Sequence, residues 1–258
     1  MKQTIAKSWA LPALVGVFLL AACRPTGPKY EVTNVEGGMV SIDSVWDAHP
    51  DADAVALLKP YKQKLDSLMN EVIGVSAMKM DKDKPESLLS NLVAEVLRTS
   101  ASHVLQHPAD LGIMNIGGLR NILPQGDITV DEVYEILPFE NSLCVLTLKG
   151  TVLRHVLEDI AAQHGQGLSG ARLEISKEGK LLSATVQGKP IVDEKEYTIA
   201  TIDYLAEGND GLPSLLQAEK RDCPDGMTLR GLFLNYVRQQ TAAGKQITSA
   251  LDGRITIK

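Results

Sequence analysis

The sequence is poor in aromatic residues and in cysteine, and it has no concentrated block of basic residues. Only 4% of its 258 residues are aromatic, with three Phe, and only three residues are Cys. The formal net charge is −6, whereas a nucleic-acid-binding surface needs clustered Lys and Arg. Nucleic-acid binding is therefore excluded as the main activity, and any anionic ligand must be held by a few local cations.

The histidines do not predict a metal site. None of the five lies in an Asp-x-His, Asn-His-Glu or His-x-His setting. His103 and His107 are four residues apart near the end of an expected helix and could meet a metal, but no carboxylate partner is evident. Solvent-facing side chains are the simpler interpretation, also for His155 and His164. No cysteine spacing resembles a zinc site, so we expect no metal and no cofactor in this chain.

The N-terminus has the parts of a secretory signal in the expected order. Two lysines precede an apolar run over residues 10–22. This run is shorter than the roughly 20 residues of a membrane-spanning helix but typical of a signal peptide. It ends in Leu-Ala-Ala-Cys, the lipobox pattern, in which Cys23 receives lipid. We expect a signal peptide at 1–22, a lipid anchor and tether at 23–52, and a membrane-anchored lipoprotein of the cell envelope.

The remaining residues mix helical and strand-like patterns. From about residue 53, apolar residues recur at steps of three and four, and Gly74 is placed to end that helix. An amphipathic approach helix is therefore expected over 53–74, and a second helix over 87–104. Thr129 and Glu132 have the spacing of a capping box that opens a short helix.

The other expected elements complete an α+β pattern. No long alternating βαβ series occurs, so we predict a single α+β domain over 53–258 with a mixed β-sheet and flanking helices. Strands are expected at 111–114, 143–148, 172–175, 184–186, 197–202 and 253–257, helices at 151–163 and 229–240, and turns at 117–118 and 126–127.

Two cysteines remain after Cys23. Cys144 and Cys223 could pair in an oxidising compartment. Cys144 lies within the apolar run of residues 143–148, however, so a small buried apolar side chain is the favoured interpretation.

Three segments carry residue types suited to ligand binding, although each also has a structural interpretation. Asn-Ile-Gly-Gly-Leu-Arg at 115–120 follows an expected buried strand; its glycines permit close approach, and Arg120 can fork onto a phosphate. A plain turn with a solvated arginine is the simpler interpretation. Phe139 follows a proline in an expected loop and is suited to base stacking. Taken by itself, however, this segment favours a buried phenylalanine that anchors a corner of the core. Tyr204 and Asp210 in a Gly-rich loop could hold a nucleoside, or the loop is an Asx-type turn.

Taken together, the motifs resemble one family. Asn-x-Gly-Gly-Leu-Arg, Gly-Asp-Ile-Thr, Pro-Phe-x-Asn and the aromatic–Gly–Asn–Asp–Gly loop occur in this order. The ordered set resembles the C-terminal, substrate-binding domain of 5′-nucleotidases, which UDP-sugar hydrolases share, and it covers about residues 53–258.

The resemblance implies a nucleotide or nucleoside ligand. Phe139 and Tyr204 would sandwich the base. Arg120 would bind the phosphate, and Asp210 would accept hydrogen bonds from the ribose hydroxyls. Asn115 would contact the sugar or phosphate, and Asn141 would contact the base edge. The substrate-binding residues implied by the resemblance are Asn115, Gly117, Gly118, Arg120, Phe139, Asn141, Tyr204 and Asp210.

The sequence departs from the family pattern at two kinds of position. Tyr204 stands where Phe is usual, which keeps the ring and adds a hydroxyl. An arginine is common where Pro85 stands here, and the usual Asn-Met-Gly reads Leu-Leu-Ser at 88–90. One phosphate-binding cation is therefore expected to be missing, unless Lys82 or Lys84 substitutes.

Full-length family members also carry an N-terminal metallophosphoesterase domain with two divalent metals. We expect this chain to supply substrate binding and specificity for nucleotide hydrolysis, with no catalytic residue of its own. The two divalent metals would then belong to a separate metallophosphoesterase subunit. A non-catalytic nucleoside- or nucleotide-binding lipoprotein, serving scavenging or sensing, stays open as the other class.

Overall fold

The computed structural model describes residue 30 and residues 32–258. The expected signal peptide at 1–22 and Cys23 lie outside the described residues. The chain divides into two compact units, one ending at Ala54 and the other running from Val55 to Lys258. The first regular element is the 3-10 helix η1 (Ser44–Ala48). Among the described residues, no helix is both long enough and apolar enough to cross a membrane.

The expected approach helix ends earlier than predicted. Helix α2 (Ala52–Met69) contains no buried residue, and Gly74 lies instead in strand β1 (Val72–Ser76). A Cβ atom on Gly74 would lie 2.6 Å from the side chain of Val237 in helix α8 (Leu229–Ala242). Gly74 therefore permits close packing between a strand and a helix, and the prediction that it ends a helix was wrong.

The strands form a two-stranded, a five-stranded and a four-stranded sheet. Those after β1 are β2 (Leu111–Met114), β3 (Gly126–Thr129), β4 (Leu143–Lys149), β5 (Gly167–Ser169), β6 (Ala171–Ile175), β7 (Leu181–Val186), β8 (Lys189–Pro190), β9 (Glu196–Ile202), β10 (Lys220–Asp222) and β11 (Ile255–Ile257). The five-stranded sheet has the order β10-β4-β9-β2-β5, in which only β2 and β9 are parallel. The four-stranded sheet has the order β11-β6-β7-β8 and is also mixed, because β11 and β6 are parallel. The α+β class with mixed sheets is confirmed, although the strands divide among several sheets.

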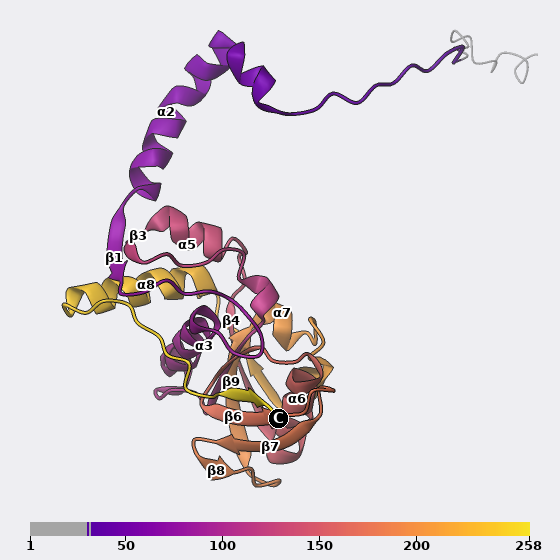
Figure 1. The fold of residues 1–258 in the computed structure, drawn as a ribbon, viewed down its shortest axis with the longest axis vertical. Helices are drawn as coiled ribbons and strands as arrows, with labels where there is room; N and C mark the ends of the chain where they lie inside the picture. The colour runs from indigo at the N-terminus through magenta and orange to yellow at the C-terminus, as the bar shows by residue number, and fades with distance from the viewer. Residues whose placement is uncertain (1–29, 31) are drawn as a thin grey trace, which may run out of the picture. The chain divides into compact units, whose positions relative to one another are not determined.

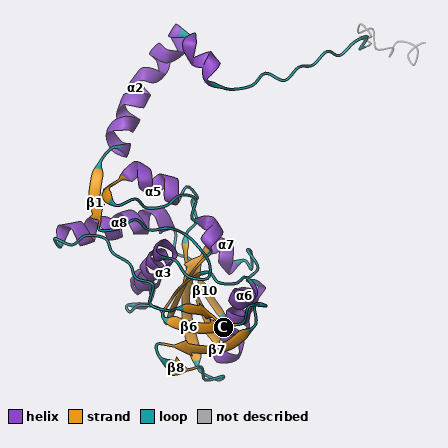
Figure 2. Cartoon of the chain, in the orientation of Figure 1, coloured by secondary structure: helices purple, strands orange, loops and turns teal. Residues whose placement is uncertain are grey.

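Helices cover both faces of the five-stranded sheet. The helices after α2 are α3 (Leu88–Ser100), α4 (Ser102–Leu105), α5 (Val130–Ile136), α6 (Gly150–Ala162), α7 (Asp203–Ala206) and α8, with the 3-10 helices η2 (Ile116–Gly118) and η3 (Pro213–Gln217). Helix α3 packs against β2, β5 and β9, and α6 against β4, β9 and the four-stranded sheet. All residues of β2 are buried, and successive strand residues point to opposite faces, so both faces are covered. Figures 1 and 2 show α3 and α6 on opposite sides of these strands.

Local signals predicted most elements, and long-range pairing explains the misses. The capping box of Thr129 and Glu132 is present. The turn expected at 126–127 is instead the start of β3, which pairs with β1. The helix expected over 87–104 is divided into α3 and α4. Strand β10 was not predicted, because its sequence Lys-Arg-Asp is polar and exposed and its pairing with β4 is distant in sequence.

Cys144 is buried, as predicted, but it is not free. It forms a disulfide with Cys223, 79 residues away. Strand β10 runs antiparallel to β4, with Asp222 opposite Val145. Cys223 follows Asp222 and Cys144 precedes Val145, so the strand pairing brings the two cysteines together. The prediction of a buried side chain is confirmed, and the pairing that the sequence left open occurs, because the β4–β10 pairing brings the two cysteines together.

Candidate functional site

A cavity of about 400 Å³ opens where three distant segments of the chain meet. The segments follow strand β2, helix α5 and strand β9. Loops after strands and helices of a packed sheet are held in place by that sheet. The cavity thus brings together all the residues implied by the motif resemblance: Asn115, Gly117, Gly118, Arg120, Phe139, Asn141, Tyr204 and Asp210.

Asn115 joins two of these segments. It follows β2 directly and is buried. Its amide Nδ2 donates to Asp210 Oδ2 at 2.6 Å, although the two residues are 95 apart in sequence. Its Oδ1 is buried and accepts no hydrogen bond from any described residue. Because an unpaired buried acceptor is costly, this oxygen is suited to accept a hydrogen bond from a ligand.

The two glycines of the first motif have different roles. A Cβ atom on Gly118 would lie 2.7 Å from Asn115 Oδ1 and 2.6 Å from Met114 Cε, so a side chain there would displace Asn115. A Cβ atom on Gly117 would have Asp210 Oδ2 as its nearest neighbour, at 3.6 Å, which is ordinary contact. The local structure therefore requires Gly118, whereas Gly117 is not required sterically.

Arg120 is the cation of the cavity. Its guanidinium lies 5.8 Å from the ring centre of Phe139, and its Nη1 donates to Gly117 O at 3.3 Å. Its side chain is exposed. Within the described residues no carboxylate forms an ion pair with Arg120, and its remaining donors are therefore open to an anion.

Two half-exposed rings border the cavity. Phe139 is 47% exposed and Tyr204 is 42% exposed. The interpretation of Phe139 as a core anchor is therefore wrong, since the fully buried phenylalanine of the described domain is Phe233. Exposed aromatic rings beside a cavity offer apolar faces to a flat ligand.

The loop after β9 supports Tyr204 and Asp210. Asn209 Nδ2 donates to Tyr204 O at 2.9 Å, which closes the loop. Asp210 has a positive φ of 57°, and its carboxylate points to Asn115 rather than capping its own turn. An Asx-type turn needs a side-chain oxygen that accepts from the backbone two residues on, and in the described structure neither Asn209 nor Asp210 makes that bond. The Asx-type interpretation is therefore wrong, and Asp210 is directed into the cavity.

The lysines considered as replacements for the missing arginine lie near this loop system but do not line the cavity. Lys82 Nζ donates to the carbonyl of Leu119, next to Arg120. Lys84 Nζ donates to Gln163 O at 2.5 Å. Neither lysine belongs to the lining residues.

Sequence reasoning missed the residues that support the cavity from behind. Buried Gln166 accepts from the backbone N of Ile116 through its Oε1, at 2.8 Å, and so fixes the first motif. Arg230 in α8 donates to Leu137 O at 3.0 Å and pairs with Glu140, on either side of Phe139. An arginine among the apolar residues that open α8 is the one local signal of Arg230.

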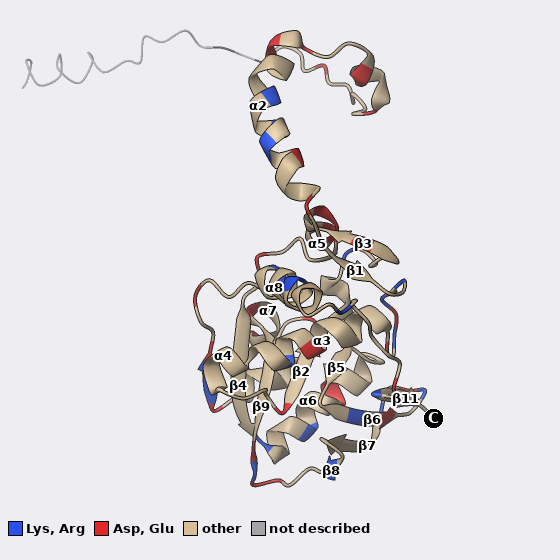
Figure 3. Ribbon diagram, turned by 90° about the vertical axis from the view of Figure 1, so that its left-hand side faces the viewer, with Lys and Arg blue, Asp and Glu red and all other residues tan. Residues whose placement is uncertain are grey.

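Charged groups elsewhere are paired or dispersed. In a second cavity, of about 320 Å³, burial raises the pKa of Glu95. Hydrogen bonds from Arg98 and Ser169 and the charges of Arg98 and Arg254 outweigh burial, so the pKa of Glu95 lies below its usual value. Figure 3 shows basic residues scattered among acidic ones rather than gathered on one element.

The histidines do not converge on one site. His103 lies in α4, and His107 follows that helix with its Nδ1 at 2.9 Å from Pro108 O. His155 and His164 are exposed, as predicted. Within residues 30 and 32–258, no group of three or more His, Cys, Asp or Glu side chains is arranged to hold a metal ion.

Relatives of known sequence are longer proteins. UshA of Yersinia enterocolitica is 27% identical over 197 residues, which cover 74% of this chain and 35% of that protein. NAD 5′-nucleotidase of Haemophilus influenzae is 31% identical over 193 residues, covering 62% of this chain and 31% of that protein. The chain therefore spans about a third of the length of the curated relatives it matches.

Solved structures and a family model agree with the fold. A 5′-nucleotidase precursor from Thermus thermophilus superposes with a TM-score of 0.69 at 26% identity, covering 82% of this chain and 44% of that chain. NAD nucleotidase of Haemophilus influenzae shares the fold, with a TM-score of 0.61 at 23% identity over 81% of this chain and 41% of that chain. The family model described as "5′-nucleotidase, C-terminal domain" matches residues 70–217. The chain belongs to the 5′-nucleotidase C-terminal domain family.

Proposed function

We propose that this chain is the substrate-binding and specificity part of a 5′-nucleotidase-type phosphohydrolase, and that it binds a nucleotide in the cavity described above. The observation that carries the proposal is the combination in one cavity of two half-exposed rings, a carboxylate and an arginine that pairs with no described carboxylate. Each group matches one part of a nucleotide: base, ribose and phosphate.

The base would lie between Phe139 and Tyr204. A base stacked on one aromatic ring gains about 1–3 kcal/mol. Both rings have free area for such contact because each is nearly half exposed. Asn141, which also lines the cavity, would contact the base edge, because an amide can both donate and accept hydrogen bonds.

The ribose and phosphate would be held by the remaining polar groups. Asp210 would accept hydrogen bonds from the ribose hydroxyls, and Asn115 Oδ1, which has no described partner, would accept another. Arg120 would form the fork to the phosphate, a charge-assisted interaction of about 1.5–3 kcal/mol. Among the described residues, Arg120 is the one arginine that lines the cavity, and Pro85 stands where the family often has a second arginine. A partner protein would therefore supply further contacts to the phosphate.

Hydrolysis would require chemistry from a second part. We propose that a metallophosphoesterase subunit carries two divalent metals, which would activate water for in-line attack on phosphorus. The residues of this chain would bind the nucleotide and orient its phosphate toward that subunit. A chain that binds nucleosides without any such subunit would instead be the scavenging or sensing lipoprotein.

The proposed location is the cell envelope, with a lipid on Cys23 as the membrane anchor. The Cys144–Cys223 disulfide supports an oxidising compartment. One relative at 27% identity is a cell wall protein of Listeria monocytogenes. Cys23→Ser should release the protein from membranes or leave it unprocessed, and unchanged fractionation and migration would rule out the lipid anchor.

The proposed function is tested by binding and turnover with 5′-AMP. The purified chain should bind AMP in calorimetric titration and should not release phosphate from it at enzyme-like rates, on the order of 1 per second or more. Addition of a metallophosphoesterase encoded beside it should produce metal-dependent release. Turnover by the chain alone would contradict the proposal that catalysis belongs to a separate subunit. AMP binding without turnover in the mixture would favour the sensing lipoprotein.

A further inference from the structure

One short segment of the chain contacts both the loop that carries Phe139 and the helix that carries Tyr204. Residues 220–230 lie antiparallel to residues 137–147, first through the pairing of β10 with β4. Backbone hydrogen bonds of 2.8 Å then join Leu143 N to Met227 O and Leu229 N to Asn141 O. We call residues 220–230 the brace. It lies beyond residues 70–217, which match the family model.

Arg230 ties the brace to the loop that carries Phe139. Its side chain is only 8% exposed, and its guanidinium lies 4.1 Å from the ring centre of Tyr134. Nη1 donates to Leu137 O at 3.0 Å, and Nη2 pairs with Glu140. These two partners stand on either side of Pro138-Phe139. A buried guanidinium keeps its hydrogen bonds because losing them leaves an uncompensated charge, so Arg230 fixes both ends of the loop tip.

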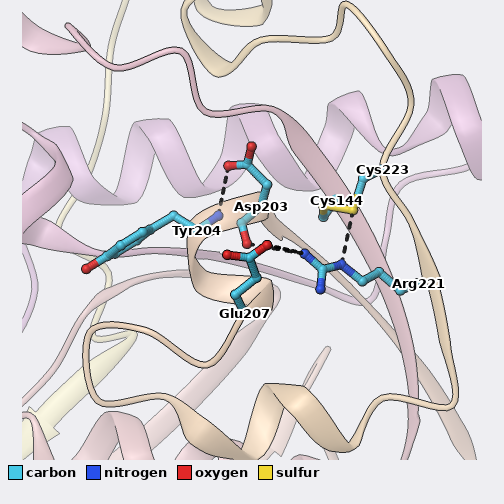
Figure 4. Close-up of a disulfide and its surroundings, with 6 residues drawn as sticks. All are labelled: Cys144, Asp203, Tyr204, Glu207, Arg221 and Cys223. Carbon is cyan, nitrogen blue, oxygen red and sulfur yellow. Dashed lines mark hydrogen bonds and ion pairs between the residues drawn. A yellow bond between two sulfur atoms is a disulfide. The ribbon is translucent and has the colours of Figure 1, made fainter. Parts of the chain in front are cut away.

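Arg221 ties the other end of the brace to helix α7, which carries Tyr204. Figure 4 shows the Arg221 side chain between Cys223 and helix α7. Its Nη2 lies 3.6 Å from Glu207 Oε1 and 3.5 Å from Asp203 O, at the two ends of that short helix. Its Nε donates to Cys223 Sγ at 3.4 Å. These contacts are longer and more exposed than those of Arg230, and so they constrain Tyr204 less tightly.

The disulfide holds the brace between these two contacts. Cys223 follows β10 and is bonded to Cys144 of β4, which leads directly from the Phe139 loop into the sheet. Backbone N of Asp203 also donates to Ser142 O at 2.9 Å. The loop of Phe139, the start of α7 and the brace are therefore joined at residues 141–144.

We propose that the brace sets the position of the Phe139 and Tyr204 rings for a base, with Arg230 and Arg221 as positioning residues and the Cys144–Cys223 disulfide as the tie. The inference rests on the proposed function, because it concerns how the same cavity grips a base. Rings that are held in place before the ligand arrives lose less freedom on binding, which raises affinity. Neither arginine touches the ligand.

The test is a double-mutant cycle on AMP affinity, measured by calorimetric titration of the full chain. Arg230→Met keeps the aliphatic stem and removes the fork; it should weaken AMP binding about tenfold. In the Phe139→Ala background the same substitution should change affinity by less than about twofold, because there is no ring left to position. If Arg230 had a merely structural role, Arg230→Met would reduce AMP affinity equally in both backgrounds. That result would contradict the proposed role of the brace.

Two further variants complete the test. Arg154→Met is the matched control, since Arg154 also bonds one carbonyl and one carboxylate, Ile191 O and Asp193, away from the cavity. It should leave AMP affinity unchanged. Cys144→Ala/Cys223→Ala should reproduce the loss seen with Arg230→Met, and wild-type affinity in this variant would overturn the role of the disulfide.

Loss of folding would not leave the proposal untested. Glu140 is 72% exposed, so Glu140→Gln should fold and still weaken the Arg230 contact. It should lower AMP affinity with Phe139 present and not with Phe139→Ala; equal affinity with and without the substitution would overturn the brace. Absence of AMP binding by wild type is a different outcome. It would contradict the proposed function, and with it the proposed role of the brace.

Discussion

Removal of the Phe139 ring should affect ligand binding far more than stability. Complete burial of a Phe side chain contributes about 1.5–3 kcal/mol, and Phe139 is 47% exposed, so Phe139→Ala should cost about 1 kcal/mol of folding free energy. The loss of one base stack should cost about 1–3 kcal/mol of binding. Because 1.4 kcal/mol is about a factor of ten, AMP affinity should fall about ten- to a hundredfold.

Phe233 provides the control for this prediction. It is fully buried in α8, so Phe233→Ala should cost about 3–5 kcal/mol of stability. Urea unfolding gives the free energies of unfolding, and calorimetric titration gives the AMP affinities. If Phe139→Ala unfolds as easily as Phe233→Ala, or binds AMP as tightly as wild type, the assignment of Phe139 to base stacking is refuted.

Three other predictions follow from the geometry. Gly118→Ala should cost about 1–3 kcal/mol of stability and weaken AMP binding, because its Cβ would meet Asn115 Oδ1. Gly117→Ala should keep the stability of wild type, and equal losses of stability in the two variants would contradict the steric argument. Reduction of the disulfide, which spans 79 residues, should lower the free energy of unfolding by about 4 kcal/mol, and a midpoint unchanged by reductant in a urea titration would contradict this. The lowered pKa of Glu95 stabilises the fold fully above its unfolded value near 4.5, and this contribution is lost as pH falls through the folded value. Below about pH 4.5, the melting temperature of Glu95→Gln should therefore fall less with decreasing pH than that of wild type. An equal fall in the two proteins would refute the stabilising role of ionised Glu95.

The sequence predicted those features of the fold that depend on neighbouring residues. The capping box needs only residues three apart, and strand β2 is marked by its own apolar side chains. Gly74 shows the limit of such signals, because glycine both ends helices and permits close packing, and only contact with α8 distinguishes the two. Strand β10 has no apolar pattern, so its pairing with β4 could not be read from residues 220–222.

The candidate site was predictable for a different reason. Its lining residues lie in motifs whose order resembles a family, and that resemblance alone predicts that they share one site. The supporting contacts had no such signal. Asn115 and Asp210 are 95 residues apart, and Arg230 and Leu137 are 93 apart. Their meeting depends on the whole sheet, which neither local pattern nor motif order specifies.

We propose above all that the cavity holds a nucleotide with its base between the rings and its phosphate at Arg120. The most direct measurement is calorimetric titration of wild type and Arg120→Ala with AMP and with adenosine. Arg120 forms no ion pair with a described carboxylate, and its side chain is exposed, so the substitution should leave the fold intact. We predict that Arg120→Ala weakens AMP binding by about tenfold or more and leaves adenosine binding within about twofold of wild type. Equal losses for both ligands, or no binding of either ligand by wild type at millimolar concentration, would contradict the account.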